Sequence, residues 1–265
     1  MYLVLAILLL LVILGLLIFL SVPKEPKEKM DPIHVEHGTF PFDVYIINMD
    51  RDKERYKYVC EQLKRVGITN YKRWEAVNGF SVDPKVMISH GVHKDMVHKN
   101  KGVAGCATSH IQLWKHIAKN KLGWTLILED DCHFHPDFME LFPQYWKHVP
   151  KDAKIIYPGY GNLPRNIQFP VSNQETLCTH GYMVDSKGAE YLLENLLPMQ
   201  NEPIDVVLEQ YFKYKEGSYI FNGTYEMSGI VPHDYKIKHQ NQCEFCGIIY
   251  QNRKDFMRTI YEDNP

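Results

Sequence analysis

The chain has 265 residues, a formal net charge of −2 and 45% hydrophobic residues. This composition is typical of a globular protein and argues against a disordered chain. The sequence has no run of basic residues that would bind a polyanion, so we expect no nucleic-acid partner. Once the N-terminus is set aside, the length suits one large domain or two tightly packed halves.

Residues 1–21 contain no charged side chain and are almost entirely apolar. About twenty such residues in a helix span the hydrocarbon core of a bilayer. No Lys or Arg precedes the run, and its end is a poor cleavage signal, which favours a retained single-pass anchor over a cleaved leader. The side of the membrane stays open, because the lysines that follow favour the cytoplasm only as a bias. Residues 22–39 are rich in Pro, Lys and Glu and are expected to form a stem before a domain at residues 40–265.

The domain opens with a pattern typical of an α/β fold. Residues 42–48 are β-branched and aromatic, which predicts a strand. A polar turn follows, and residues 54–66 place apolar side chains at helical spacing. Arg51 and Arg55 lie at this turn, where arginine forks suit diphosphate oxygens. From the local sequence alone, ion pairs with neighbouring acids explain these arginines better.

A second short strand is expected at residues 71–77. The polar stretch 81–101 carries histidines without the compact spacing of metal ligands, and we expect a mobile loop over the active site. Small residues dominate 102–110 and lead into a helix, which lets a ligand or a neighbouring strand approach the backbone closely. A hydrolase built on Ser109 and His110 is disfavoured, because adjacent residues of a helix do not face each other.

Residues 124–131 form the most informative stretch. A short apolar run, with the length of a buried parallel strand, ends in Glu129, Asp130 and Asp131. Ligands of open α/β sheets bind at the carboxyl ends of such strands. Clustered carboxylates repel one another unless a cation lies between them, and hard oxygen ligands favour Mg²⁺ or Mn²⁺. The alternative, that the acids merely begin a solvated loop, stays open at this point.

Further strands are expected near residues 154–157 and 179–184, and helices at 186–197 and from residue 203. Asp205 lies in the first turn of the last helix, where a carboxylate is favoured electrostatically without any catalytic role.

Two short motifs near the C-terminus leave alternatives open. Cys243 and Cys246 have a Cys-x-x-Cys spacing that suits a small zinc site, a disulfide or two free thiols. Asn222 begins an N-glycosylation acceptor, which is usable only if the domain is lumenal.

Three stretches taken together resemble glycosyltransferase family 25, which includes bacterial lipooligosaccharide galactosyltransferases and procollagen galactosyltransferases. Residues 45–55 are similar to the first strand and turn of the family, although Met49 stands where leucine is usual. Residues 105–114 resemble its Gly-Cys-x-x-Ser-His helix start, and residues 129–131 its Glu-Asp-Asp strand end. The resemblance covers roughly residues 42–212.

The resemblance implies a GT-A-type, Rossmann-like nucleotide-sugar-binding domain behind the transmembrane helix. It also implies that a short acidic motif holds Mn²⁺ (or Mg²⁺) on the diphosphate of a UDP-sugar. By position, the implied metal ligands are Asp131, Glu129 and, from the C-terminal segment, His233. The residues implied to lie near the donor are Asn48, Arg51, Arg55, Ser109, His110, Glu129 and Asp130. Asp205, in a looser match, would be the base of an inverting transfer.

We therefore expect a membrane-anchored glycosyltransferase that moves galactose or glucose from a UDP-sugar to a hydroxyl of a glycan, lipid or protein acceptor. A metal-dependent phosphoesterase would use the same acids, but it would want further ligands for a second metal. A domain that binds nucleotide-sugars without turnover is the third hypothesis, and the intact acidic triplet argues against it.

Overall fold

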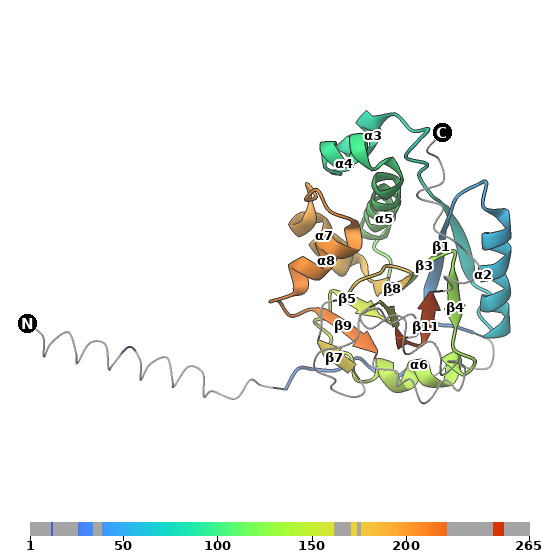
Figure 1. Cartoon of the computed structure of the whole chain (residues 1–265). Coiled ribbons are helices and arrows are strands. Elements are labelled where there is room, and N and C mark those ends of the chain that lie inside the picture. Colours follow the sequence, from blue (N-terminus) through green and yellow to red (C-terminus); the bar gives the residue numbers. More distant parts are fainter. Residues whose placement is uncertain are drawn as a thin grey trace, which may run out of the picture.

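The computed structural model describes residues 12, 26–33, 39–161, 171–173, 176–221 and 246–251. Within these residues a seven-stranded mixed sheet forms the centre, in the order β2-β1-β3-β8-β5-β9-β7 (Figure 1). Its strands are β1 (Asp43–Asn48), β2 (Tyr71–Glu75), β3 (Thr125–Glu129), β5 (Ile155–Tyr157), β7 (Val171–Asn173), β8 (Gly181–Val184) and β9 (Ser218–Phe221). Two short antiparallel pairs join β6 (Gly159–Tyr160) to β10 (Cys246–Gly247), and β4 (Cys132–Phe134) to β11 (Ile249–Gln251).

The first three strands of the sheet point the same way. β1 lies between β2 and β3 and pairs with both in parallel, so that Ile47 has Trp74 on one side and Glu129 on the other. β8 runs antiparallel to β3. The carboxyl ends of β1, β2 and β3 therefore lie at one edge of the sheet, where open α/β sheets bind their ligands.

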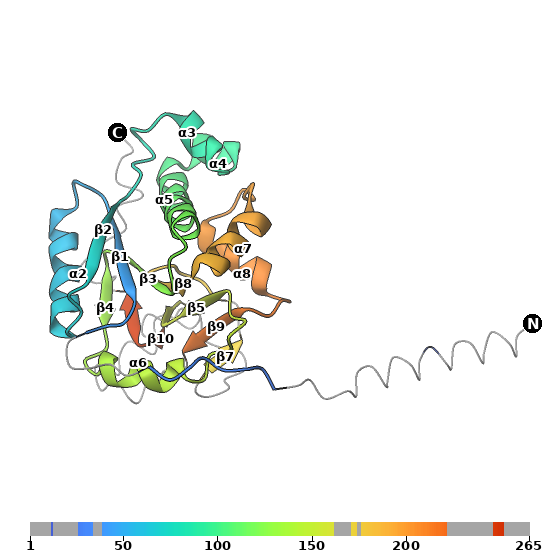
Figure 2. The same cartoon turned by 180° about the vertical axis from the view of Figure 1, so that it is seen from behind.

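Helices cover both faces of the sheet (Figure 1, Figure 2). The helices α2 (Lys53–Arg65) and α6 (Phe138–Trp146) pack on one face. The helices α5 (Lys101–Lys119), α7 (Ser186–Leu196) and α8 (Ile204–Phe212) pack on the other. Along β1, Val44 and Ile46 pack in the core beside α2 and α6, whereas Tyr45 and Ile47 pack in the core beside α5, α7 and α8. This alternation between two buried faces explains why the strands are almost continuous apolar runs.

The polar stretch 81–101 forms two short helices, α3 (Pro84–Ser89) and α4 (Lys94–Lys99), so the prediction of a loop was wrong. Each helix is mostly solvated and buries only one or two side chains, such as Met87 and Val97, in the core beside α5. So few apolar positions give no visible helical period in the sequence.

Residues 26–33, in the middle of the predicted stem, lie against the domain. The Nζ of Lys27 is 2.7 Å from carboxylate oxygens of Asp152 and Glu216. The backbone N–H of Met30 donates to the carbonyl of Val149 at 2.7 Å. This part of the stem is held by the fold and is not a free linker.

The predicted membrane span at residues 1–21 lies outside the described residues, except for Val12. No helix in the described part of the chain is long and apolar enough to cross a membrane. Asn222 and Cys243 also lie outside the described residues, as does the side chain of Cys246.

Gly105 allows α5 to pack closely against the segment that follows β2. A β-carbon at this position would lie 2.5 Å from the carbonyl oxygen of Val77 and 2.7 Å from the backbone nitrogen of Gly79. Ser109, one turn further on, accepts a hydrogen bond from the N–H of Val77 at 2.8 Å. The small residues of this stretch thus serve close packing of backbone on backbone, one of the two roles that the sequence indicates.

Replacing Gly105 with alanine is expected to lower the free energy of unfolding by about 1–3 kcal/mol, because the added methyl overpacks against fixed backbone. The loss is expected even though alanine is the better helix former. Gly123→Ala is the matched control, since a β-carbon there has no neighbour within 4 Å. Urea unfolding measures both variants, and equal stability would contradict the close packing.

Candidate active site

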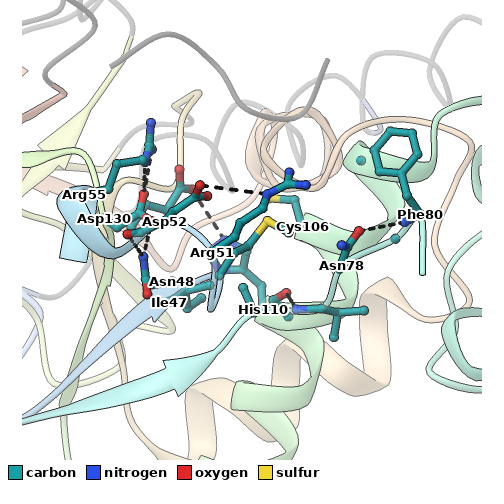
Figure 3. A pocket seen from close by; sticks show the side chains of 17 residues that line it. Ile47, Asn48, Arg51, Asp52, Arg55, Asn78, Phe80, Cys106, His110 and Asp130 are labelled. Carbon is teal, nitrogen blue, oxygen red and sulfur yellow. Dashed lines mark hydrogen bonds and ion pairs between the residues drawn. The ribbon is translucent and has the colours of Figure 1, made fainter. Parts of the chain in front are cut away.

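A cleft opens where β1, β2 and β3 end (Figure 3). Its walls come from the turn after β1, residues 76–80 after β2, the first half of α5 and the end of β3. It adjoins a groove of about 720 Å³ that shares Met49, Arg51 and Asn78 with it and also includes Trp74. The chemically active side chains of the cleft are Asn48, Arg51, Asp52, Arg55, Asn78, Cys106, Ser109, His110, Glu129 and Asp130. The cleft lies where the crevice rule for open α/β sheets places a ligand.

Asn48, the last residue of β1, is a buried hydrogen-bonding centre. Its Nδ2 donates to Asp130 Oδ2 at 2.7 Å and to the carbonyl of Asp52 at 3.0 Å. Its Oδ1 accepts from Arg73 Nε at 2.9 Å. Both amide protons and the side-chain carbonyl are therefore engaged, and Asn48 positions Asp130 rather than offering a free amide to a ligand.

Arg55 reaches from the first turn of α2 to the acids at the end of β3. Its Nε donates to Asp130 Oδ1 at 2.7 Å, and its Nη2 lies 2.6 Å from the same oxygen and 3.4 Å from Asp131 Oδ2. Only 13% of its side chain is exposed. Burial is the largest single effect and acts to lower the pKa of Arg55, but the charge and hydrogen bond of Asp130, with the charges of Asp131 and Glu129, together raise it. The guanidinium is thus a buried counter-ion of the acidic triplet.

Arg51 is the more accessible arginine of the cleft. Its side chain is 38% exposed and lies 3.9 Å from Asp52 Oδ1. Figure 3 shows it extending away from the buried group of Asn48, Arg55 and Asp130. The two arginines at the same turn therefore differ in role, since Arg55 neutralises acids and Arg51 faces the space that a ligand would enter.

Asp131 is buried and only partly satisfied. Its Oδ2 accepts from Gln251 Nε2 at 3.0 Å, but its Oδ1 has no hydrogen-bond partner within the described part of the chain. Burial, followed by the charge of Glu129, raises the pKa of Asp131 to about 7. Asp131 is not among the residues that line the described cleft. A cation beside Oδ1 would offset both the cost of burying the ionised carboxylate and its repulsion by Glu129.

Glu129 turns toward α5 and the start of β8. Its Oε1 accepts from Thr179 Oγ1 at 2.6 Å and lies 3.5 Å from His110 Nε2. His110 is fully buried, and its Nδ1 shares a hydrogen bond with the hydroxyl of Tyr182 at 2.8 Å. Burial acts to raise the pKa of Glu129, but His110 and Thr179 hold it at about 2. Glu129 is therefore an ionised carboxylate in a largely buried place.

The three predicted acids do not surround one point. Asp130 accepts hydrogen bonds from Asn48 and Arg55. Glu129 accepts one from Thr179, and Asp131 accepts one from Gln251. In the described ranges, the His, Cys, Asp or Glu donors that gather in a group of three are Cys106, His110 and Glu129. Their ligand atoms lie within 4.8 Å of one another.

Ser109, predicted near the donor, has structural partners. Its Oγ donates to the carbonyl of Gly105 and accepts from the N–H of Val77, each at 2.8 Å. Ser109 lines the cleft, but its hydroxyl serves to hold the segment after β2 against α5.

Asp205 lies in the first turn of α8, where its Oδ2 accepts from the N–H of Cys178 at 3.2 Å. It does not line the described cleft. Its charge nevertheless contributes, after burial and Glu129, to raising the pKa of the Cys106 thiol. Asp205 is therefore within electrostatic reach of the cleft. His233 lies outside the described residues, and its role stays a prediction.

Arg73 and Tyr182 are the functional supports that the sequence did not indicate. Arg73 holds Asn48 through its side-chain and backbone oxygens, and Tyr182 orients His110. Each lies in a strand, and the sequence around it does not indicate which distant residue its side chain contacts.

Arg55→Met is expected to destabilise the chain by about 3–5 kcal/mol in the presence of a chelator, because it leaves buried carboxylates without their counter-ion. The matched control is Lys72→Met, whose pair with Asp43 is at 3.4 Å and whose side chain is 63% exposed. That change is expected to cost about 1 kcal/mol or less. Denaturant unfolding measures both, and similar losses would show that Arg55 is not the counter-ion described here.

Comparison with known proteins agrees with the resemblance. The sequence model of the family described as "Glycosyltransferase family 25 (LPS biosynthesis protein)" matches residues 42–164. A protein of Acanthamoeba polyphaga mimivirus with a provisional glycosyltransferase name is 37% identical over 117 residues, which are 43% of this chain and 36% of that protein. Procollagen galactosyltransferase 1-A of Xenopus laevis is 26% identical over 219 residues, 74% of this chain and 33% of that protein.

A solved structure of a glycosyltransferase involved in glycosylation of the major capsid of PBCV-1 aligns with 72% of this chain and 99% of its own, at 10% identity and a TM-score of 0.33. The chain spans about a third of the length of the two sequence relatives. Residues 42–164, which carry the β1 turn, the start of α5 and the acidic end of β3, match the model of glycosyltransferase family 25.

Proposed function

We propose that the chain is a glycosyltransferase that moves galactose or glucose from a UDP-sugar to a hydroxyl of a glycan, lipid or protein acceptor. The observation that carries this proposal is the acidic cluster at the carboxyl ends of parallel strands, beside a cleft and inside the segment that matches the family. The procollagen galactosyltransferase among the relatives supports galactose. A GT-A-type donor site and anchoring in a membrane through residues 1–21 belong to the same proposal.

In this proposal the cleft and the adjoining groove receive the nucleotide-sugar. Arg51 is the guanidinium that meets the diphosphate, because it lines both spaces and is partly exposed. The groove volume, about 720 Å³, is in the range of small-molecule sites. Trp74 contributes an aromatic surface and Asn78 an amide to its lining.

A divalent cation, Mn²⁺ or Mg²⁺, is part of the proposal. Asp130 and Asp131 share one buried guanidinium, that of Arg55, so this pair of acids keeps an excess of negative charge. Asp131 is its first ligand, because Oδ1 has no partner among the described residues and carboxylate oxygen suits these ions. Such an ion, when bound, neutralises the departing diphosphate.

Asp205 is the proposed base of an inverting transfer. Inversion needs a carboxylate that takes the proton of the acceptor hydroxyl on the face opposite the leaving group. The Asp205 oxygens accept backbone hydrogen bonds from Cys178 and Val206 at 3.2 and 3.0 Å, which fix the carboxylate and leave further lone pairs.

The full-length chain, incubated with Mn²⁺ and a panel of UDP-sugars, is expected to release UDP from one donor. Asp131→Asn is expected to lower this rate at least about 100-fold while the shape of the side chain is kept, since the ion that neutralises the departing diphosphate loses its carboxylate ligand. Lys72→Met is the control and is expected to turn over normally. UDP release that is unaffected by Asp131→Asn and by chelation would refute the metal assignment. Donor binding without release, even with acceptors supplied, would identify a binding domain, and hydrolysis of phosphoesters alone would identify a phosphoesterase.

Asp205→Asn is expected to reduce kcat about 100-fold or more while the Kd for UDP stays within a factor of two, because a general base acts on the acceptor and not on donor binding. Calorimetry with UDP and steady-state kinetics with an acceptor separate the two effects. An unchanged kcat would leave Asp205 with its structural role alone.

A further inference from the structure

Cys106, His110 and Glu129 bring three metal-type donors to one place. Cys106 and His110 lie one turn apart on α5, which puts them on the same side of the helix, and Glu129 comes from the end of β3. Their donor atoms lie within 4.8 Å of one another, and His110 Nε2 is 3.5 Å from Glu129 Oε1. In a tetrahedral zinc site with bonds of about 2.0–2.3 Å, neighbouring donors lie roughly 3.3–3.8 Å apart. The group is therefore close to the spacing of a metal site.

A thiol, an imidazole and a carboxylate can also form a nucleophile relay. In a relay the acid holds one imidazole nitrogen and the thiol meets the other. Here the hydroxyl of Tyr182 holds Nδ1 at 2.8 Å, and Glu129 lies on the Nε2 side. Because Tyr182 occupies Nδ1 and Glu129 lies beside Nε2, no imidazole nitrogen is left for the thiol alone, and the arrangement fits donors that converge on a common point.

The support around His110 is that of a metal-binding histidine. Nε2 is buried and has no hydrogen-bond partner among the residues that the structure describes. Tyr182, which meets Nδ1, also accepts from Trp114 Nε1 at 2.8 Å, so the ring is fixed from behind. When a histidine binds metal through Nε2, its Nδ1–H donates to such a neighbour and sets the tautomer.

We propose that Cys106, His110 and Glu129 bind one divalent ion of the zinc class, with an open coordination position that faces the cleft. The sulfur ligand favours zinc over the hard ions Mg²⁺ and Mn²⁺. All three residues line the cleft, and three protein ligands leave a tetrahedral ion one free position. On binding, the Cys106 thiol loses its proton to solvent and a sulfur–metal bond forms. This site is separate from the hard-cation site at Asp131 and does not depend on the proposed transferase activity.

The full-length chain, freed of metal by a chelator, is titrated with Co²⁺ as the probe. Cobalt bound to a thiolate gives a near-ultraviolet charge-transfer absorption that oxygen-bound cobalt lacks. We expect the band to saturate at one equivalent, to disappear in Cys106→Ser and to weaken in His110→Gln. Cys60→Ser, on α2, is the matched control and is expected to keep the band. No band in the wild-type chain, or a band that survives in Cys106→Ser, would overturn the site.

Cys243 and Cys246 are the competing thiols, and the paired variant Cys243→Ser/Cys246→Ser is expected to keep the band. Its loss in that variant would move the metal to the C-terminal segment and overturn the proposal. X-ray absorption of the zinc-loaded wild-type chain needs no variant to fold. One sulfur per zinc, with nitrogen and oxygen ligands, is the expected result, whereas no sulfur or two sulfurs would refute it.

Discussion

The hydrogen bonds and the ion pair that hold Asp130 fix the geometry of the acidic end of β3, residues 129–131. Asn48 reaches it from β1 and Arg55 from α2, and both contacts are at 2.7 Å. The same carboxylate thus ties the ends of β1 and β3 to α2, the helix that follows β1. It also sets the charge, because one buried guanidinium offsets one of three adjacent acids and leaves the others to find partners elsewhere. Buried carboxylates without a counter-ion are unstable in the ionised form, which explains why the remaining charge shapes the site.

The acidic triplet is therefore three carboxylates with three different roles. Glu129 is the last residue of β3 and meets His110 and Thr179, while Asp131 meets Gln251 of β11. Glu129 ends β3, whereas Asp130 and Asp131 lie in the turn before β4, so the chain changes direction between them and the three side chains meet different neighbours. Asp130 is structural, Glu129 joins a buried imidazole, and Asp131 keeps an oxygen that a hard cation suits. The proposed transferase chemistry and the proposed zinc-class site draw on different members of the triplet for this reason.

The sequence was informative where the structure is determined by local pattern. The buried strands β1 and β3, the helix α2 and the position of the cleft all follow from apolar periodicity and the crevice rule. The contacts that make the site were not predictable in the same way. The main partner of Arg55 lies 75 residues away, and Tyr182 lies 72 residues beyond His110. Neither pairing leaves a trace in local spacing, so Arg55 looked like a surface residue paired with its neighbours. The helices α3 and α4 and the docking of residues 26–33 escaped prediction because each relies on very few apolar or charged contacts.

A crystal structure of the chain with UDP and Mn²⁺, with the ion located by its anomalous scattering, tests the central claim most directly. The cleft is predicted to hold the nucleotide with its diphosphate beside Arg51, and the ion is predicted to contact Asp131. A nucleotide bound away from the ends of β1 and β3, or an ion with no contact to Asp131, would contradict the assignment of this edge of the sheet as the donor site.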